Sequence, residues 1–328
     1  MTMRLQHLLI TLLTLAVIGC SSTPKARNHS VEEDGQRHGN SVYYWKTAFE
    51  LNDSEKAFLK THQVKRLYLR LFDVVPADIT PTNDYEVVPN ATVAFREAMP
   101  EGVEIVPVVY ITIDALRLIN SPKHNYAEII TQRILNMADF HDLGNIREVQ
   151  LDCDWTQQTQ ESYFDFCREV KERLEPYGIQ LSCTIRLWQL ACACPPVDRG
   201  VLMLYNTGSI TNPETHNSIL DLNDVNAYLK NKPYGLPLDY AYPTYSWYVW
   251  FRDNTYMGLF HNQPSMGLEA GDRVRFEHVS FDELRKLDSI VKLKMPGAEN
   301  ASIILYHLDS ADLSNYTDDE IRQIFSHD

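Results

Sequence analysis

Two carboxylates spaced two residues apart are the clearest chemical feature of this sequence. Asp152 and Asp154 follow apolar residues of the kind that form a buried strand, and Trp155 comes directly after them. Because side chains two apart on a strand point the same way, the two carboxylates would share one face. Their repulsion would push their pKa values apart. A carboxylic acid held protonated near neutral pH is what hydrolysis of a glycosidic bond needs.

Eight short runs rich in β-branched and aromatic residues alternate with helical patterns along the chain. They predict strands at 42–46, 66–74, 104–111, 148–155, 180–187, 201–206, 236–242 and 301–307. The 3.6-residue patterns between and after them predict helices at 53–62, 126–140, 161–177, 221–231, 280–291 and 318–325. This alternation predicts an α/β fold, a (β/α)8 TIM barrel that forms a single domain over residues 41–328. An open doubly wound sheet is the alternative, but the sequence contains no Gly-rich phosphate-binding loop.

The ends of the predicted strands gather aromatic and polar residues. In a TIM barrel the loops that follow the strands build the active face. The candidate substrate-binding residues at these ends are Trp45, Trp155, Arg186, Trp188, Tyr205, Asn206, Tyr242, Trp247 and Tyr306. Flat aromatic faces stack on sugar rings and polar groups bind hydroxyls, so we expect a carbohydrate cleft, shaped by the long connections 76–100 and 247–279. The alternative is that the aromatics only close a half-buried barrel rim.

Two motifs resemble those of the chitinase-type (family 18) glycoside hydrolases. The run LDCDWT at 151–156 resembles their fourth-strand signature, in which two acids are followed two residues later by a catalytic Glu, often with Trp before it. The run MLYN at 203–206 is similar to their sixth-strand Met-x-Tyr-Asp. The resemblance implies a glycosidase-like barrel with a glycan as partner. The sequence is also similar to a less characterised group of bacterial lipoproteins whose barrel has the Asp-x-Asp strand without that Glu.

The catalytic assignment depends on a departure from this pattern, because Thr156 stands where the family has its proton donor. If the barrel hydrolyses a glycan, Asp154 is the candidate general acid, since it lies nearer the strand end, and Asp152 would raise the pKa of Asp154 by its charge. Asp239 on the seventh strand is the candidate nucleophile or base, because a glycosidase pair flanks the scissile bond.

The remaining candidates have supporting roles. Tyr205 and Asn206 could orient the substrate, and Arg186 could hold a carboxylate. Thr156 leaves open a catalytically inactive barrel that only binds a glycan. A structural envelope protein is a third possibility.

The amino terminus predicts export and lipidation. Arg4 and the apolar run 8–18 form a signal-peptide pattern that is too short to span a membrane. The residues before Cys20 resemble the bacterial lipoprotein processing box, which implies a signal peptide at 1–19 and a lipidated (palmitate-carrying) Cys20 as membrane anchor. The polar stretch 20–40 predicts a flexible tether. Ser21 resembles outer-membrane sorting in a Gram-negative cell envelope; an ordinary secretory signal is the alternative.

Charge and cysteine usage exclude several partners. The formal net charge of −14 argues against nucleic acid. Five cysteines remain after Cys20, and they lack the spacing of a metal site, so we expect no metal and no cofactor. They are expected to be mostly buried thiols with at most one disulfide.

Overall fold

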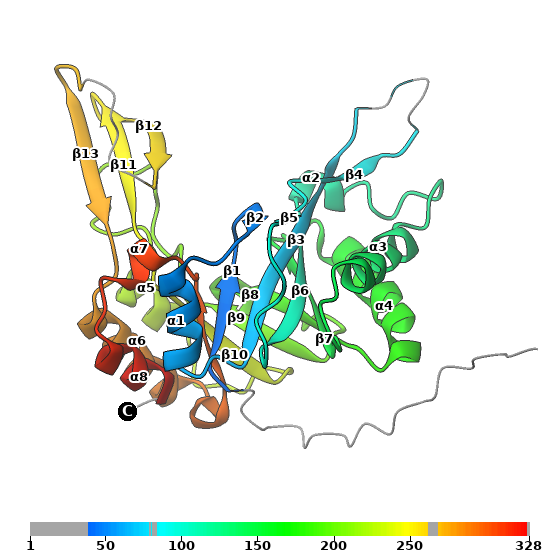
Figure 1. Cartoon of the computed structure of the whole chain (residues 1–328). Coiled ribbons are helices and arrows are strands. Elements are labelled where there is room, and N and C mark those ends of the chain that lie inside the picture. The colour runs from blue at the N-terminus through cyan, green and yellow to red at the C-terminus, as the bar shows by residue number, and fades with distance from the viewer. Residues whose placement is uncertain (1–38, 79, 81–83, 262–267, 327–328) are drawn as a thin grey trace, which may run out of the picture. The chain divides into compact units, whose positions relative to one another are not determined.

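The computed structural model describes residues 39–78, 80, 84–261 and 268–326 (Figure 1). The predicted signal peptide, the lipidated Cys20 and nearly all of the tether lie outside the described residues. Among the described helices, none is both long enough and apolar enough to cross a membrane.

Eight parallel strands form a closed barrel, which confirms the predicted fold class. The strands are β1 (Ser41–Tyr44), β3 (Arg66–Pro76), β6 (Glu104–Ile111), β7 (Glu148–Cys153), β8 (Gln180–Arg186), β9 (Arg199–Met203), β10 (Leu238–Pro243) and β14 (Ile303–Tyr306). Each pairs with the next, and β1 pairs in parallel with both β3 and β14, so the sheet has no open end within this ring. The strands read as apolar runs because both faces are buried.

The helices also follow the prediction closely. The longer ones are α1 (Asp53–Thr61), α3 (Tyr126–Phe140), α4 (Gln160–Leu174), α5 (Leu222–Tyr228), α6 (Phe281–Lys294) and α8 (Asp318–Ser326), and α2 (Ile113–Leu116) and α7 (Ser310–Leu313) are single turns. Capping boxes at Asn52 and Ser280 fix the starts of α1 and α6.

Two connections of the barrel have no long helix. The chain from β3 to β6 forms β4 (Val87–Asn90) and β5 (Ala94–Phe95), and β5 pairs with β2 (Ala48–Phe49). The single turn α2 lies only beyond β6. The chain from β8 to β9 contains only the 3-10 helix Leu187–Ala191. The outer layer is therefore an incomplete ring of helices.

The predicted long insertion after the seventh strand is a small antiparallel sheet. It consists of β11 (Trp247–Arg252), β12 (Thr255–Phe260) and β13 (Asp272–Glu277), with β11 in the centre. Figure 1 shows it projecting from the barrel above the carboxyl ends of the strands. Val249 and Phe251 are fully buried, and the guanidinium groups of Arg273 and Arg275 lie 5.5 and 5.1 Å from the Phe251 ring.

Two residues predicted to bind substrate lie instead in the outer layer. Trp155 is 0% exposed and stacks on Tyr163 of α4 at 6.2 Å between ring centroids. Tyr242 is also fully buried, and its hydroxyl donates to Asp288 of α6 at 2.9 Å. The predictions for Trp155 and Tyr242 are wrong because neighbouring residues of a strand face opposite sides, and these two face the helices.

We expect Trp155→Ala to lower the free energy of unfolding by about 3–5 kcal/mol, the usual cost of removing a large aromatic side chain from a core. Urea denaturation measures this. Tyr177→Ala is the matched control, since the Tyr177 ring is 58% exposed, and it should change stability by only about 0.5 kcal/mol. Wild-type stability in Trp155→Ala would contradict the buried position of the indole.

Candidate functional site

A column of polar side chains on β7 lines the barrel interior. Gln150 and Asp152 point inward, and Asp154 follows just past the strand. Tyr43 donates its hydroxyl hydrogen to Gln150 Oε1 at 2.7 Å, and Thr184 Oγ1 donates to Asp152 Oδ1 at 2.6 Å. The shared face predicted for the two carboxylates is consistent with these contacts, since β8 supplies the partners of both Asp152 and Asp154. Buried polar groups are satisfied in this way by neighbouring strands.

Asp154 forms a bidentate ion pair with Arg186 of β8. Arg186 Nε donates to Oδ1 at 2.5 Å and Nη2 donates to Oδ2 at 2.9 Å. The two side chains are 35% and 24% exposed, so the pair lies at the mouth. A carboxylate held by both arms of a guanidinium group is in its ionised form. This contact argues against Asp154 as the general acid, and it occupies the guanidinium that was expected to hold a substrate carboxylate.

Asp152 is the carboxylate whose protonation the barrel favours. Only 8% of the residue is exposed. Burial, and next the charge of Asp154, raise the pKa of Asp152 to about 6, although the Thr184 hydrogen bond and the charge of Arg186 act to lower it. The prediction was that Asp152 raises the pKa of Asp154, whereas in the structure Asp154 raises the pKa of Asp152. The reason is depth, because the deeper carboxylate loses more hydration.

Asp239 lies at the opposite end of the barrel. It is 1% exposed and is the second residue of β10. Its Oδ1 accepts from the backbone N–H of Ser302 at 2.8 Å, and Oδ2 lies 3.5 Å from Nη1 of Arg199, the first residue of β9. These contacts place Asp239 at the amino ends of the strands, whereas Asp154 is at the carboxyl ends. The prediction that the two carboxylates flank one glycosidic bond is therefore wrong.

Aromatic rings cover one side of the mouth, and we call them the aromatic cluster: Trp45, Tyr205, Tyr245, Trp247 and Tyr306. The Tyr306 ring lies 5.7 Å from Trp45, 4.8 Å from Tyr205 and 5.6 Å from Tyr245, and Tyr245 lies 5.2 Å from Trp247. Tyr205 and Tyr245 are buried, whereas Trp45, Trp247 and Tyr306 are half-buried. The structure thus joins four predicted substrate residues with Tyr245, which the sequence interpretation missed.

The other two predicted substrate residues lie at the rim. Asn206 is exposed after β9, has a left-handed φ of 54°, and accepts from the Tyr245 hydroxyl at 2.6 Å through Oδ1. Trp188 is half-buried on the 3-10 helix after β8, and its ring lies 5.4 Å from that of the buried Trp155. Asn206 is therefore connected to the aromatic cluster, and Trp188 packs on the outer layer.

Three further residues complete the mouth on the side of β3 and β6. Arg70 Nε donates to Asp73 Oδ1 at 2.7 Å, and a second contact makes this pair bidentate. Arg70 and Asp73 are three residues apart on β3, and the pairing of β3 with β6 shifts its register between Arg70 and Phe72. The Arg70 guanidinium lies 5.7 Å from the Trp45 ring. Tyr110 is half-buried, and burial together with the charges of Asp154 and Asp152 raises its pKa to about 12.

The cysteines and acids form no metal centre in the part of the chain that the structure describes, where no group of three His, Cys, Asp or Glu side chains could hold a metal ion. Cys153, Cys167 and Cys183 are buried thiols, and Cys192 and Cys194 are half-buried and unpaired with each other or with the buried three.

Solved structures with the same architecture are chitinases and related enzymes. A chitinase from Chromobacterium violaceum has a TM-score of 0.55 and 11% identity over 85% of this chain and 98% of its own. The spore cortex-lytic enzyme SleL of Bacillus cereus has a TM-score of 0.51 and 14% identity, covering 86% of this chain and 75% of that one. The group IV chitinase of Ostrinia furnacalis, solved in complex with allosamidin, has a TM-score of 0.52 and 12% identity, with 84% and 94% covered.

These similarities define the class of fold. The chain has the closed eight-stranded parallel barrel with surrounding helices that chitinase-type glycoside hydrolases and SleL share. No protein-family model matches the sequence, and no curated protein sequence is significantly similar to it.

We expect Asp154→Asn to lower the pKa of Asp152 from its value near 6 toward the ordinary range of an aspartate, because the substitution removes the charge that raises it and releases Arg186. The pH titration of the Asp152 carboxyl carbon by NMR measures this. Asp114→Asn is the control, since that side chain is 71% exposed and is paired with Arg117. An unchanged Asp152 titration in Asp154→Asn would contradict the coupling.

Proposed function

We propose that this protein binds a glycan at the carboxyl ends of its barrel strands. The observation that carries the proposal is the aromatic cluster, in which Trp45, Trp247 and Tyr306 are half-buried and Tyr205 and Tyr306 lie within electrostatic range of Arg186. Aromatic faces stack on the apolar faces of sugar rings, while carboxylate and guanidinium groups bind hydroxyls. Both kinds of contact are present at one mouth.

The structural neighbours indicate which glycans to test. Two of them are chitinases and one is a spore cortex-lytic enzyme, so their names refer to chitin and to a cortex. By analogy, we propose a chain of amino sugars as the ligand class of this barrel. We also propose that the lipidated Cys20 anchors it to the outer membrane, which would place the mouth near envelope glycans.

The contacts favour binding without hydrolysis by two carboxylates. Asp154 is engaged by Arg186, and Asp239 lies at the other end of the barrel. Thr156 cannot donate a proton in place of an acid, and its hydroxyl lies 3.4 Å from that of Thr159 in the turn before α4. Asp73 is also engaged, by Arg70, so none of Asp73, Asp154 and Asp239 is an unengaged carboxylate that could act as a base beside Asp152.

We expect Trp45→Ala to weaken binding of chitooligosaccharides by roughly tenfold in isothermal titration calorimetry, because stacking on an aromatic ring contributes about 0.5–1.5 kcal/mol beyond the buried area. Trp45→Phe should retain most of the affinity. Tyr228→Ala serves as control, because that ring is 44% exposed on α5, away from the aromatic cluster. If neither chitooligosaccharides nor peptidoglycan fragments bind the wild-type protein, the proposed function fails.

Hydrolysis is the second candidate function, and one observation favours it: the pKa of Asp152 is raised to about 6, as suits a proton donor. A general acid must be protonated, so turnover should be highest below pH 6 and fall as the pH rises past that value. Asp152→Asn should then abolish product formation from chromogenic chitooligosaccharides while binding persists. Turnover retained in Asp152→Asn would exclude Asp152 as the donor.

A further inference from the structure

The connection from β8 to β9 carries a fully buried side-chain amide, Gln189. This residue lies on the 3-10 helix Leu187–Ala191 and is 0% exposed. An amide that is removed from water needs hydrogen-bond partners inside the protein. Gln189 finds them in two backbone groups that are distant from each other in the sequence, so it links two segments of the barrel mouth.

The Gln189 amide binds the backbone beside both partners of the mouth's ion pair. Its Oε1 accepts from the backbone N–H of Arg186 at 2.8 Å, and its Nε2 donates to the carbonyl oxygen of Trp155 at 3.0 Å. The first contact is the half of a capping box in which the third helical residue reaches back to the residue before the helix. The second contact is made to the residue directly after Asp154. Gln189 therefore holds the end of β8 against the chain that follows β7.

These hydrogen bonds lie where the parallel pairing of β7 with β8 has ended. The last paired residues of the two strands are Leu151 and Cys183. Asp154 and Arg186 are each three residues further along, so they oppose each other in the same register. The strand ladder no longer fixes the distance between the two backbones at that point. The amide of Gln189 supplies the link that the ladder lacks there.

We propose that Gln189 is a positioning residue of the barrel mouth, whose amide holds the Arg186 guanidinium in its bidentate contact with Asp154. A bidentate contact requires both side chains in one geometry, and arginine loses much rotamer freedom in adopting it. Hydrogen bonds from neighbouring residues reduce that freedom beforehand. The inference deepens the proposed function, because this ion pair is part of the mouth at which we propose that a glycan binds.

Gln189→Met tests the proposal, because methionine has nearly the volume of glutamine and removes both hydrogen bonds. The readout is the exchange of the Arg186 Nε–H proton with water, measured by ¹⁵N NMR. We expect this exchange to be roughly tenfold faster in Gln189→Met, since the guanidinium then leaves the carboxylate more often. An unchanged exchange rate would overturn the proposal, as would a crystal structure of Gln189→Met in which Arg186 keeps both contacts with Asp154.

A second buried amide separates positioning from a general loss of stability. Asn217 is 8% exposed, donates from Nδ2 to the carbonyl oxygen of His278 at 2.8 Å, and accepts from the backbone N–H of Ile219 at 3.0 Å. Asn217→Leu should therefore lower stability in urea much as Gln189→Met does, yet leave the exchange of Arg186 unchanged. Equally fast exchange in both variants would assign the effect to lost stability and contradict the positioning role.

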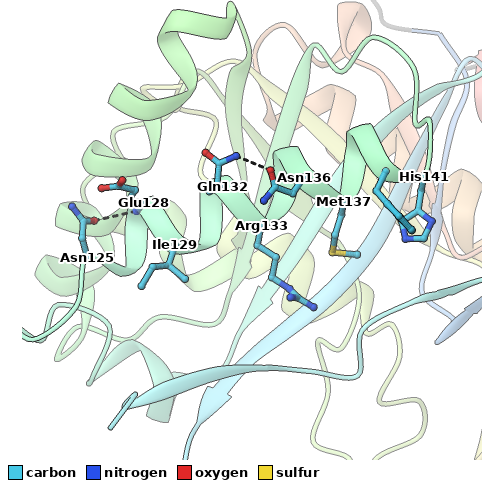
Figure 2. A pocket seen from close by; sticks show the side chains of 9 residues that line it. Asn125, Glu128, Ile129, Gln132, Arg133, Asn136, Met137 and His141 are labelled. Atoms are coloured by element: carbon cyan, nitrogen blue, oxygen red, sulfur yellow. Dashed lines mark hydrogen bonds between the residues drawn. The ribbon is translucent and has the colours of Figure 1, made fainter. Parts of the chain in front are cut away.

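An exposed amide gives the control for the substitution itself. Gln132 lies on the surface of α3, and its Nε2 donates to Asn136 Oδ1 of the same helix at 2.7 Å (Figure 2). Gln132→Met should change neither stability nor the exchange of Arg186.

The test remains available if Gln189→Met does not fold. Gln189→Asn keeps an amide at the buried position but is one methylene too short to reach both partners, so the exchange of Arg186 should again be faster. Wild-type exchange in a folded Gln189→Asn would count against the proposal. These measurements need no glycan, so a failure of chitooligosaccharide binding and a failure of the positioning role are separate results.

Discussion

The ion pair between Asp154 and Arg186 sets the chemistry of the barrel mouth. By holding Asp154 as an anion it leaves a fixed negative charge two residues above the buried Asp152. That charge adds to the effect of burial and keeps the pKa of Asp152 near 6. The same charges also raise the pKa of Tyr110. Burial and the charge of Asp154 therefore make Asp152 the mouth carboxylate whose protonation is favoured, and the ion pair with Arg186 argues against Asp154, the predicted general acid.

The alternation of β7 explains why polar chemistry can exist inside a barrel that is otherwise packed. Glu148, Gln150, Asp152 and Asp154 face inward, and each meets a partner from another strand. Val149, Leu151 and Cys153 between them, and Trp155 just beyond them, face the helices and are fully buried. Because both faces are buried, an error of one residue moves a side chain from the site to the outer layer. The same alternation separates Asp239, which faces the barrel interior, from Tyr242, which is three residues further along β10 and faces outward.

The fold was predictable from the sequence because strand and helix patterns are local. The eight barrel strands and the helix at 126–140 follow from apolar periodicity alone. The site was only partly predictable, because it depends on which end of a strand and which face a residue occupies. Asp239 was misplaced since it lies at the start of β10 rather than at its end. Thr184 and Tyr245 were missed because their roles come from contacts with Asp152 and Asn206, which are distant in the sequence.

The charge balance of the mouth narrows the kind of glycan that suits it. Asp73 and Asp154 are each paired with an arginine, so these pairs carry no net charge. Asp152 adds one buried negative charge when ionised and none when protonated, and the change falls near pH 6. These groups together are neutral or singly negative, so they give no electrostatic attraction to a polyanion. The body's overall excess of acids acts in the same direction. Stacking and hydroxyl contacts with an uncharged sugar chain are therefore the interactions that this barrel can offer most strongly.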